Sequence, residues 1–318
     1  MVRIASFIRT YLLRMVIVAL GVSTLCFLAV EFSPGDRAFD VAIARYGLDG
    51  ATVSATEYVR DSEGLDRHPF VRYQAWLSSL IRGKWGHSMI GGEEIFPMLI
   101  RSFQRTAILG GVSLIFSLLL AFPLGIYCGC HPGGIIDISS SILSSLLVSF
   151  PSFIKGALLI LLLAVKLQLF PVAGFTSGWH IALPAIILAI GLAAESCRVI
   201  ASSVKQVCQS EHYNFAQHKG LFGHQLFLPH GLLNALVPIT TYVGLQAAEL
   251  LDGVVVIETL FACPGLGSHL LDALRSGDIL AIQGAGLLLG WIYVTVNSLT
   301  EWLSDSFTPA DKKEGLVL

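Results

Sequence analysis

The stretch SVKQVCQSEHYNFAQHKGLFGHQLFLPHGLLNALVP, from Ser203 to Pro238, separates two long apolar segments of the chain. Its run Tyr213 to Lys219 is long enough for about two turns of helix, and Gly220 is of the residue type that most often ends one. Asn234 to Pro238 then leads back into apolar sequence. Because each flanking segment is long enough to cross a bilayer, we predict a loop outside the membrane that a partner could contact.

The composition is that of a membrane protein. Hydrophobic residues make up 54% of the 318 residues and charged residues 13%, and the mean hydropathy is +0.72, against roughly 45–50% apolar and about 25% charged in soluble domains. The net charge of -2 does not favour nucleic acid as a partner. The six cysteines lie mostly in or beside apolar runs, which predicts small core residues and not a zinc site.

Six segments are predicted to span the membrane. Residues 1–32 hold a short cytosolic tail and the first span, which follows Arg3, Arg9 and Arg14. This span is longer than the apolar core of a signal peptide and lacks a small-residue cleavage site after it. The other five spans are predicted at 106–128, 138–165, 181–204, 236–261 and 281–303.

Six spans place both termini on one side of the membrane, and the Lys and Arg residues of the short loops put that side in the cytosol. The remaining segments are then an external segment at 33–105, a cytosolic loop at 205–235 and a cytosolic tail at 304–318. The connection at 129–134 should be cytosolic, although it contains no Lys or Arg. The expected fold is an all-α membrane protein with six transmembrane helices.

Motifs of enzymes and nucleotide sites are missing from the sequence. It contains no GxxxxGK[ST] phosphate loop, no GxSxG and no HExxH, so neither nucleotide binding by that loop nor catalysis is predicted. Four histidines recur every six residues, but six residues advance a helix by about 600°, so that neighbours do not converge on a metal ion. These are His212, His218, His224 and His230. We expect no enzyme activity, no metal and no cofactor.

Acidic residues lie inside the expected fifth span. Glu249 and Asp252 are three positions apart and can share a helix face, with Gln246 one turn earlier. Ionisable groups at membrane depth usually face a bundle interior or a watery cavity. One interpretation is that these three residues line a translocation path, where two acids would favour a cationic substrate. The other is that the acids pair with backbone or with a partner subunit.

Four parts of the chain then carry a family resemblance. They are Leu13–Leu25 with Ser33–Asp36, Tyr73–Leu77 with Gly86–Ser88, Tyr213–Gly220 with Asn234–Pro238, and Glu258–Gly267. In this order they resemble the membrane-spanning subunits of binding-protein-dependent ABC importers, specifically the dipeptide, oligopeptide and nickel permease family, in the branch with a long external segment after the first helix. The resemblance covers nearly the whole chain.

The resemblance implies a type I permease fold in the bacterial inner membrane. It also implies a second homologous permease subunit, two ATP-binding cassette subunits that bind the ATP, an external substrate-binding protein, and peptide or nickel-chelate substrates. The motif of the cytosolic loop is similar to a coupling helix that docks on the ATPase subunit; it comprises Tyr213, Asn214, Phe215, Ala216, Gln217, His218, Lys219 and Gly220. The chain departs from the family in having Leu221 to Gln225 where arginines are usual, and Pro229 is expected to interrupt the helix.

A second hypothesis belongs to another class of protein. An ion-coupled secondary transporter or channel could use Glu249 and Asp252 as proton or cation sites without any ATPase. Such proteins often contain inverted repeats, and no long repeat is visible in this sequence. A membrane enzyme is the third and weakest hypothesis, because no nucleophile, base or metal cluster is recognisable.

Overall fold

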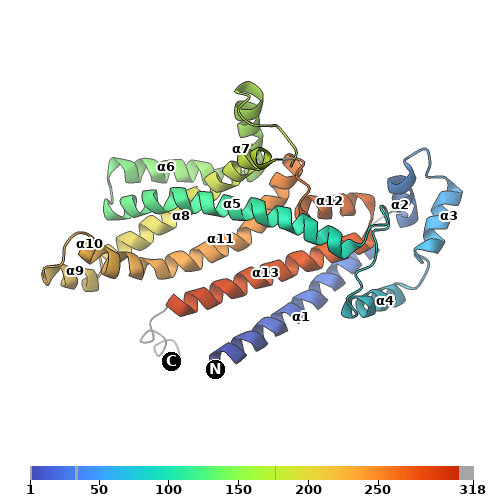
Figure 1. The fold of residues 1–318 in the computed structure, drawn as a ribbon, viewed down its shortest axis with the longest axis horizontal. Helices are drawn as coiled ribbons and strands as arrows, with labels where there is room; N and C mark the ends of the chain where they lie inside the picture. The colour runs from blue at the N-terminus through green and yellow to red at the C-terminus, as the bar shows by residue number, and fades with distance from the viewer. Residues whose placement is uncertain (1, 33–34, 176, 308–318) are drawn as a thin grey trace. The chain divides into compact units, whose positions relative to one another are not determined.

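The computed structural model describes residues 2–32, 35–175 and 177–307, with side chains for 7–32, 35–175 and 177–304. These ranges are helices joined by short connections (Figure 1), and their β structure is limited to an isolated bridge between His87 and Glu94. The expected all-α class is therefore confirmed for the described ranges. Ser33 and Pro34 of the amino-terminal signature, and the tail at 308–318, lie outside them.

The helices follow one another along the chain with two π-helical stretches among them. In order they are α1 (Val2–Glu31), α2 (Arg37–Tyr46), α3 (Val53–Ser62), α4 (Pro69–Ile81), α5 (Ile95–Cys130), α6 (Ile135–Ser149), α7 (Ser152–Leu159), η1 (Ile160–Lys166), α8 (Gly178–Cys208), α9 (Glu211–His218), α10 (His224–Leu226), η2 (Phe227–Leu232), α11 (Leu233–Leu260), α12 (Leu266–Ser276) and α13 (Ile279–Phe307).

Four of these helices are long and apolar enough to cross a membrane. The candidate spans lie in α1, α5, α8 and α13, and the bent pair formed by α6 and α7–η1 counts as a fifth if it is one span. Helix α11 covers the expected fifth span but is not among them. Length and composition of the described residues thus support four or five spans, and the expected number of six is not established.

The expected third span is broken in the structure. Its two halves, Ile135–Ser149 and Ser152–Lys166, are bent by 100° with respect to each other. The break falls at Pro151, which has no backbone N–H to donate, and Phe150 before it adopts an extended conformation with φ -90° and ψ 129°. A residue before proline is disfavoured in the helical region, so the chain ends α6 there and begins α7 anew.

The described chain divides into two compact units. The first unit comprises residues up to 106 together with 264–294, and the second comprises 107–263 together with the residues from 295 on. The expected external segment forms α2, α3 and α4 of the first unit. Its last residues already belong to α5, which begins at Ile95 and not at Thr106.

In the first unit, α2 and α4 are attached to α1 by charge. Glu31, the last residue of α1, accepts hydrogen bonds from Arg37 of α2 at 2.8 Å and from Arg72 of α4 at 2.6 Å. Helices α2 and α3 bury Val41 and Val59 against each other. One carboxylate therefore joins the end of α1 to both α2 and α4.

A second polar attachment in the first unit fixes the start of α13. The carboxylate of Asp278, only 2% exposed, accepts hydrogen bonds from the hydroxyl of Ser88 at 2.5 Å and from the backbone N–H of Ala281 at 3.1 Å. The side chain thereby caps the helix and holds the loop after α4 in place.

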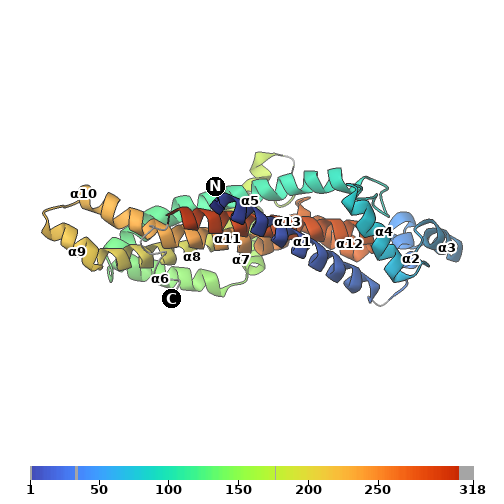
Figure 2. The ribbon, with the colours of Figure 1, turned by 90° about the horizontal axis from the view of Figure 1, so that it is seen from below.

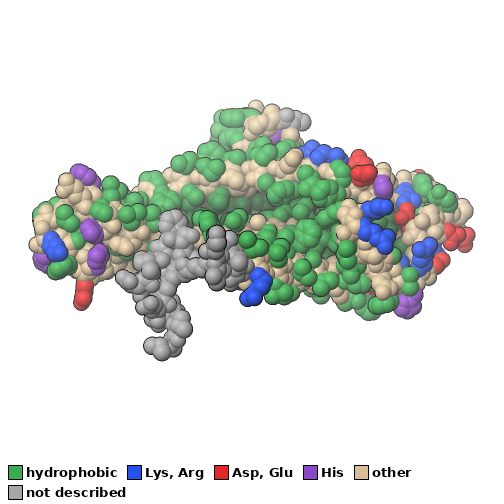
Figure 3. Space-filling model, turned by 60° about the horizontal axis from the view of Figure 1, so that its bottom comes forward, with side chains coloured by type: hydrophobic (Ala, Val, Ile, Leu, Met, Phe, Trp, Pro, Cys, Tyr) green, Lys and Arg blue, Asp and Glu red, His purple; other side chains and the backbone are tan. Residues whose placement is uncertain are grey.

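In the second unit, α8 lies between α6 and α11 (Figures 1 and 2). The core of this bundle includes Leu183 and Ile187 of α8 with Leu250 and Ile257 of α11. Helix α6 carries exposed apolar side chains, and Ile138 among them is more than half exposed. Many other hydrophobic side chains lie on the surface of the molecule (Figure 3). Such a surface suits contact with lipid.

Helices α5 and α8 approach closely because α5 offers glycines at the contact. A Cβ added to Gly125 would lie 2.8 Å from Ile200, and one added to Gly129 would lie 2.6 Å from Val204. Small residues at such contacts let helices in a membrane pack tightly. Gly111 of the same helix has nothing within 4 Å of the corresponding position.

We therefore predict that Gly125→Val destabilises the protein and Gly111→Val does not. The valine at 125 would overlap Ile200, with a loss of about 1–3 kcal/mol, whereas position 111 has room. Thermal unfolding of the detergent-solubilised protein measures the difference. Equal midpoints for the two variants would contradict the close contact of α5 and α8.

Candidate coupling surface and translocation path

The predicted loop helix is α9, which runs from Glu211 to His218. Ser210 caps its start, because the serine hydroxyl accepts a hydrogen bond from the backbone N–H of Tyr213 at 3.3 Å. At its other end Gly220 adopts φ 90°, a conformation that glycine reaches without strain. The helix thus starts two residues before the expected run and ends at His218, two residues before the expected glycine.

The eight residues of the motif divide between two faces of α9. Ala216 is buried and Tyr213 half-buried, so these two point toward the rest of the second unit. The other six residues are exposed; they are Asn214, Phe215, Gln217, His218, Lys219 and Gly220. Helix α9 therefore has one exposed face and one face that packs against the rest of the second unit.

The exposed face of α9 is centred on an aromatic ring. Phe215 is 60% exposed, and the ammonium of Lys219 lies 4.5 Å from its ring centroid, a cation–π contact. A second aromatic residue, Phe222, is 64% exposed in the following turn. Large apolar side chains at a polar end of the molecule are typical of a surface that a partner covers.

The buried face of α9 contacts the stretch that returns toward α11. A Cβ on Gly231 would lie 3.3 Å from the ring of Tyr213, so the glycine leaves room for that ring. His212 and His230 also meet, with 3.3 Å between Nε2 of the first and Nδ1 of the second. Burial, followed by the influence of Cys208, raises the pKa of Tyr213 above its ordinary value.

The spacing of the four histidines did not reveal this pair. It was judged on a continuous helix, whereas the chain turns back between α9 and η2, so that residues 18 apart become neighbours. Histidine side chains are visible at this end of the second unit (Figure 3). Within the described ranges no three His, Cys, Asp or Glu side chains form a group that could hold a metal ion.

Pro229 does not interrupt the helix as expected. The chain remains helical from α10 through η2 into α11, and Phe227–Leu232 adopts π-helical geometry around the proline. A π-helical turn inserts one residue, which accommodates a ring that cannot donate a backbone hydrogen bond. The connection from the loop to α11 is therefore continuous helix.

Glu249 and Asp252 lie exposed on α11. Among the described residues neither makes an ion pair or a hydrogen bond through its carboxylate. Pairing within the described part of the chain, one of the two interpretations of these acids, thus finds no support. An exposed carboxylate on a helix between apolar neighbours requires water or a partner subunit.

Gln246 occupies a different position from the two acids. Its side chain is fully buried, accepts a hydrogen bond from the hydroxyl of Ser196 at 2.6 Å and donates one to the backbone oxygen of Leu192 at 2.7 Å. Both partners belong to α8. The structure therefore places Gln246 between α8 and α11, where it joins the two helices, and not beside the acids.

Helix α8 carries a polar stripe that the sequence analysis did not single out. Its members follow at intervals of three or four residues and so share one face; they are Gly191, Glu195, Arg198, Ser202 and Lys205. The carboxylate of Glu195 accepts a hydrogen bond from the hydroxyl of Tyr242 of α11 at 3.2 Å. The rule that pointed to Glu249, an ionisable residue inside an apolar span, applies equally to Glu195 and Arg198.

The stripe borders two neighbouring cavities. One, of about 410 Å³, is lined by Glu195, Arg198 and Ser202 with Tyr242. The other, of about 280 Å³, is lined by Arg198, Ser202 and Lys205 together with Asp137 of α6. Arg198 and Ser202 border both, so the cavities form a polar face along α8 in the half of the helix that leads to α9.

Lys155 of α7 and Glu249 of α11 extend this polar face. A Cβ on Gly191 would lie 3.0 Å from the ammonium of Lys155 of α7, which also interacts electrostatically with Glu195. Glu249 interacts with Tyr242 in the same way. Groups of both charges therefore lie along one side of the second unit.

Residues 121–311 match the family of binding-protein-dependent transport system inner membrane components. The chain belongs to this family. A glutathione transport system permease protein, GsiC of Escherichia coli, is 31% identical over 91% of this chain and 93% of its own length. A probable peptide ABC transporter permease protein of Sinorhizobium fredii is 29% identical over 92% of this chain and 95% of its own length.

A solved structure supports the fold. The crystal structure of an amino acid ABC transporter with histidines superposes with a TM-score of 0.52 at 13% identity, covering 66% of this chain and 92% of that chain. Membership of the family makes the permease a multi-pass inner-membrane component of a transport system that works with ATPase and substrate-binding partners, and it is not an enzyme. The ion-coupled transporter hypothesis is not favoured.

The geometry predicts opposite results for Gln246 and Glu249. Gln246→Leu removes two buried hydrogen bonds and leaves the Ser196 hydroxyl without its acceptor, so the permease should lose about 1–3 kcal/mol of stability. Glu249→Gln changes an exposed group and should leave stability within about 0.5 kcal/mol. Thermal unfolding in detergent compares the two; a stable Gln246→Leu variant would argue against the contact with α8.

Proposed function

We propose that the permease forms half of the translocation pathway of an ABC importer for short peptides. A second homologous permease subunit supplies the other half, an external binding protein delivers the substrate, and two ATP-binding cassette subunits drive the cycle. In this arrangement α11 is the fifth of six spans and both termini lie in the cytosol. The observation that carries the proposal is α9, a short helix with an exposed aromatic face between two long helices.

The ATPase contact is proposed for the exposed face of α9. Phe215 and Phe222 are apolar anchors of the kind that fills a groove on a partner, and Lys219 adds one positive charge beside Phe215. The family usually has arginines after the Lys-Gly pair, whereas this chain has Leu221 to Gln225. Docking here accordingly depends on aromatic contact more than on charge.

The translocation path is proposed along the polar stripe of α8 and the neighbouring residues of α11. Charged side chains in a membrane protein mark substrate routes because their hydration must be replaced by polar partners. Glu195, Arg198 and Lys205 supply both signs of charge on α8, while Glu249 and Asp252 add negative charge on α11. Gln246 contributes by joining the two helices.

The mixed charge of this path supports a zwitterionic substrate. A peptide carries an ammonium group that suits the acids and a carboxylate that suits Arg198 and Lys155. The names of the two relatives, which mention peptide and glutathione transport, support the same class. A cationic or nickel-chelate substrate is the second candidate, and the observation in its favour is the exposed pair Glu249 and Asp252.

The role of α9 is tested by Phe215→Ala and by deletion of Tyr213 to Gly220. Both variants should insert in the membrane normally, and ATP-driven peptide uptake should fall by roughly tenfold or more because an anchor of the contact is lost. Phe70→Ala, at a phenylalanine of α4 with 62% exposure against 60% for Phe215, is the matched control. Full uptake after the deletion would refute coupling through α9.

The substrate class is tested by neutralising the path. Arg198→Gln should raise the substrate concentration for half-maximal uptake of a dipeptide by about tenfold, since it removes a charge-assisted hydrogen bond to the carboxylate. Glu249→Gln with Asp252→Asn should weaken uptake of a cation more than that of the dipeptide. Arg275→Gln, at an exposed residue of α12, is the control.

These measurements use proteoliposomes that contain the whole transporter, with ATP hydrolysis recorded in parallel. Unchanged dipeptide uptake by Arg198→Gln would exclude the stripe of α8 as the path. A loss confined to nickel or another cation would replace the peptide by the second candidate.

A further inference from the structure

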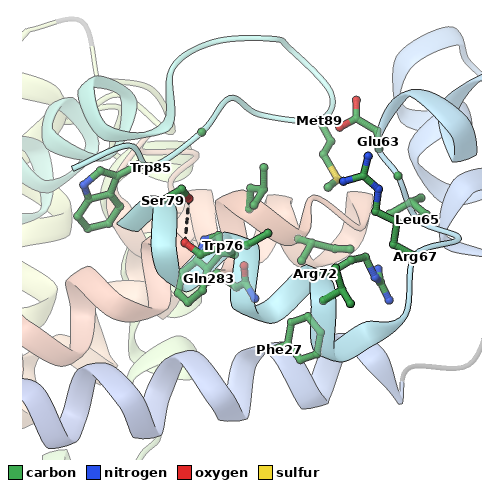
Figure 4. A pocket seen from close by; sticks show the side chains of 16 residues that line it. Phe27, Glu63, Leu65, Arg67, Arg72, Trp76, Ser79, Trp85, Met89 and Gln283 are labelled. Carbon is green, nitrogen blue, oxygen red and sulfur yellow. Dashed lines mark hydrogen bonds between the residues drawn. The ribbon is translucent and has the colours of Figure 1, made fainter. Parts of the chain in front are cut away.

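The first unit contains a cavity that the proposed transport cycle does not use. It has a volume of about 280 Å³ and lies between α1, α4, the segment around Trp85 and the start of α13 (Figure 4). Most of its lining is apolar and aromatic, including Phe27, Leu65, Trp76 and Met89. A cavity of this size is far larger than one water molecule needs and lies just below the range of small-molecule pockets.

A buried amide without a partner faces this cavity. Gln283 of α13 is 1% exposed and lines the cavity, yet its Nε2 has no hydrogen-bond acceptor. Figure 4 shows its side chain beside Trp76. Buried donors are nearly always paired in folded proteins, because an unpaired donor loses its hydrogen bonds to water and gains no other hydrogen bond. The amide therefore calls for an oxygen acceptor from outside the chain.

The charges around the cavity leave one cation uncompensated. Arg72 pairs with Glu31 at 2.6 Å, and Glu63 pairs with Arg45. Arg67, the remaining charged residue of the lining, is exposed and makes no ion pair among the described residues. An acceptor group that carries negative charge is thus favoured over a donor.

The cavity also lies at one end of two candidate spans. Phe27 is near the last turn of the candidate span in α1, and Gln283 is near the first turn of the one in α13. Trp76 and Trp85 are of a residue type that is enriched where a protein meets the membrane surface. An apolar ligand that partitions into this region would be supplied at high local concentration.

We propose that this cavity binds a small amphipathic molecule with an oxygen acceptor at its head. Gln283 Nε2 donates to that oxygen, Arg67 adds positive charge to the lining, and the apolar body lies against Phe27, Leu65 and Trp76. A free medium-chain carboxylic acid and the ester end of a membrane lipid share this chemistry. The inference stands apart from the proposed function, since it requires neither α9 nor the stripe of α8.

The test uses octanoate as the free acid and dibrominated phosphatidylcholine as the lipid, with the full chain purified in detergent or in nanodiscs. Octanoate should bind saturably and quench or shift tryptophan emission in the wild type. Gln283→Leu should weaken its binding by about tenfold, the loss of one hydrogen bond. The thermal unfolding midpoint of the Gln283→Leu variant should be equal to or above that of the wild type, because an unpaired amide is removed from the interior.

Two further variants sharpen the interpretation. Gln74→Leu, at an exposed glutamine of α4 outside the lining, is the matched control and should bind like the wild type. Arg67→Gln should weaken the binding of octanoate. If the occupant is a lipid ester, Arg67→Gln should keep the quenching by brominated lipid, whereas Gln283→Leu should lose it. Retained quenching by brominated lipid in Arg67→Gln identifies the bilayer as the source of the ligand.

Three results would overturn the proposal. Octanoate and brominated lipid could both fail to bind the wild type, which would leave water as the occupant. Gln283→Leu could bind both probes as the wild type does. A photoreactive residue at Ala75, which lines the cavity, could capture the external binding protein in place of either probe, and the cavity would then be part of a protein interface.

Discussion

The second unit depends on how helix α8 divides its surface among its neighbours. One side meets the glycines of α5 at van der Waals distance, a second side holds the amide of Gln246 from α11, and a third carries Glu195 and Arg198 next to open cavities. A helix with an apolar environment on all sides could not keep these charges. The contacts of α8 with α5 and α11 fix the rotation of the helix, so that its charged side faces the cavities and not an apolar environment.

The two polar contacts of α11 with α8 have different consequences. The buried hydrogen bonds of Gln246 are satisfied at both ends, so they specify the register of the two helices and exchange nothing with solvent. The hydroxyl of Tyr242 meets Glu195 at the edge of a cavity, where a substrate could compete for it. Glu249 and Asp252 have no partner in the described chain, and this supports a second permease subunit or a water-filled path opposite them.

Local patterns predicted the helices of this chain better than their ends and contacts. Apolar runs and the Gly220 stop depend on neighbouring residues, and α9 formed where they indicated. The 100° bend at Pro151, the start of α5 at Ile95 and the continuous helix through Pro229 depend on packing with distant segments. The polar stripe of α8 was within reach of sequence reasoning, because Glu195 and Arg198 stand inside a predicted span, whereas the burial of Gln246 was not.

In the proposed cycle, motion passes from α9 to α11 through short contacts between side chains. Tyr213 packs on Gly231, and His212 meets His230, so α9 is attached to η2 by a ring in a glycine recess and by a polar pair. Helix η2 continues without a break into α11, which carries Tyr242 and Glu249. In the proposed cycle, a displacement of α9 by the ATPase would therefore reach Tyr242 through about three turns of continuous helix. The last residues of η2, up to Leu232, are the weakest part of that path, because π-helical hydrogen bonding is less regular than that of an α-helix, and bending concentrated there would move α11 relative to the stripe of α8.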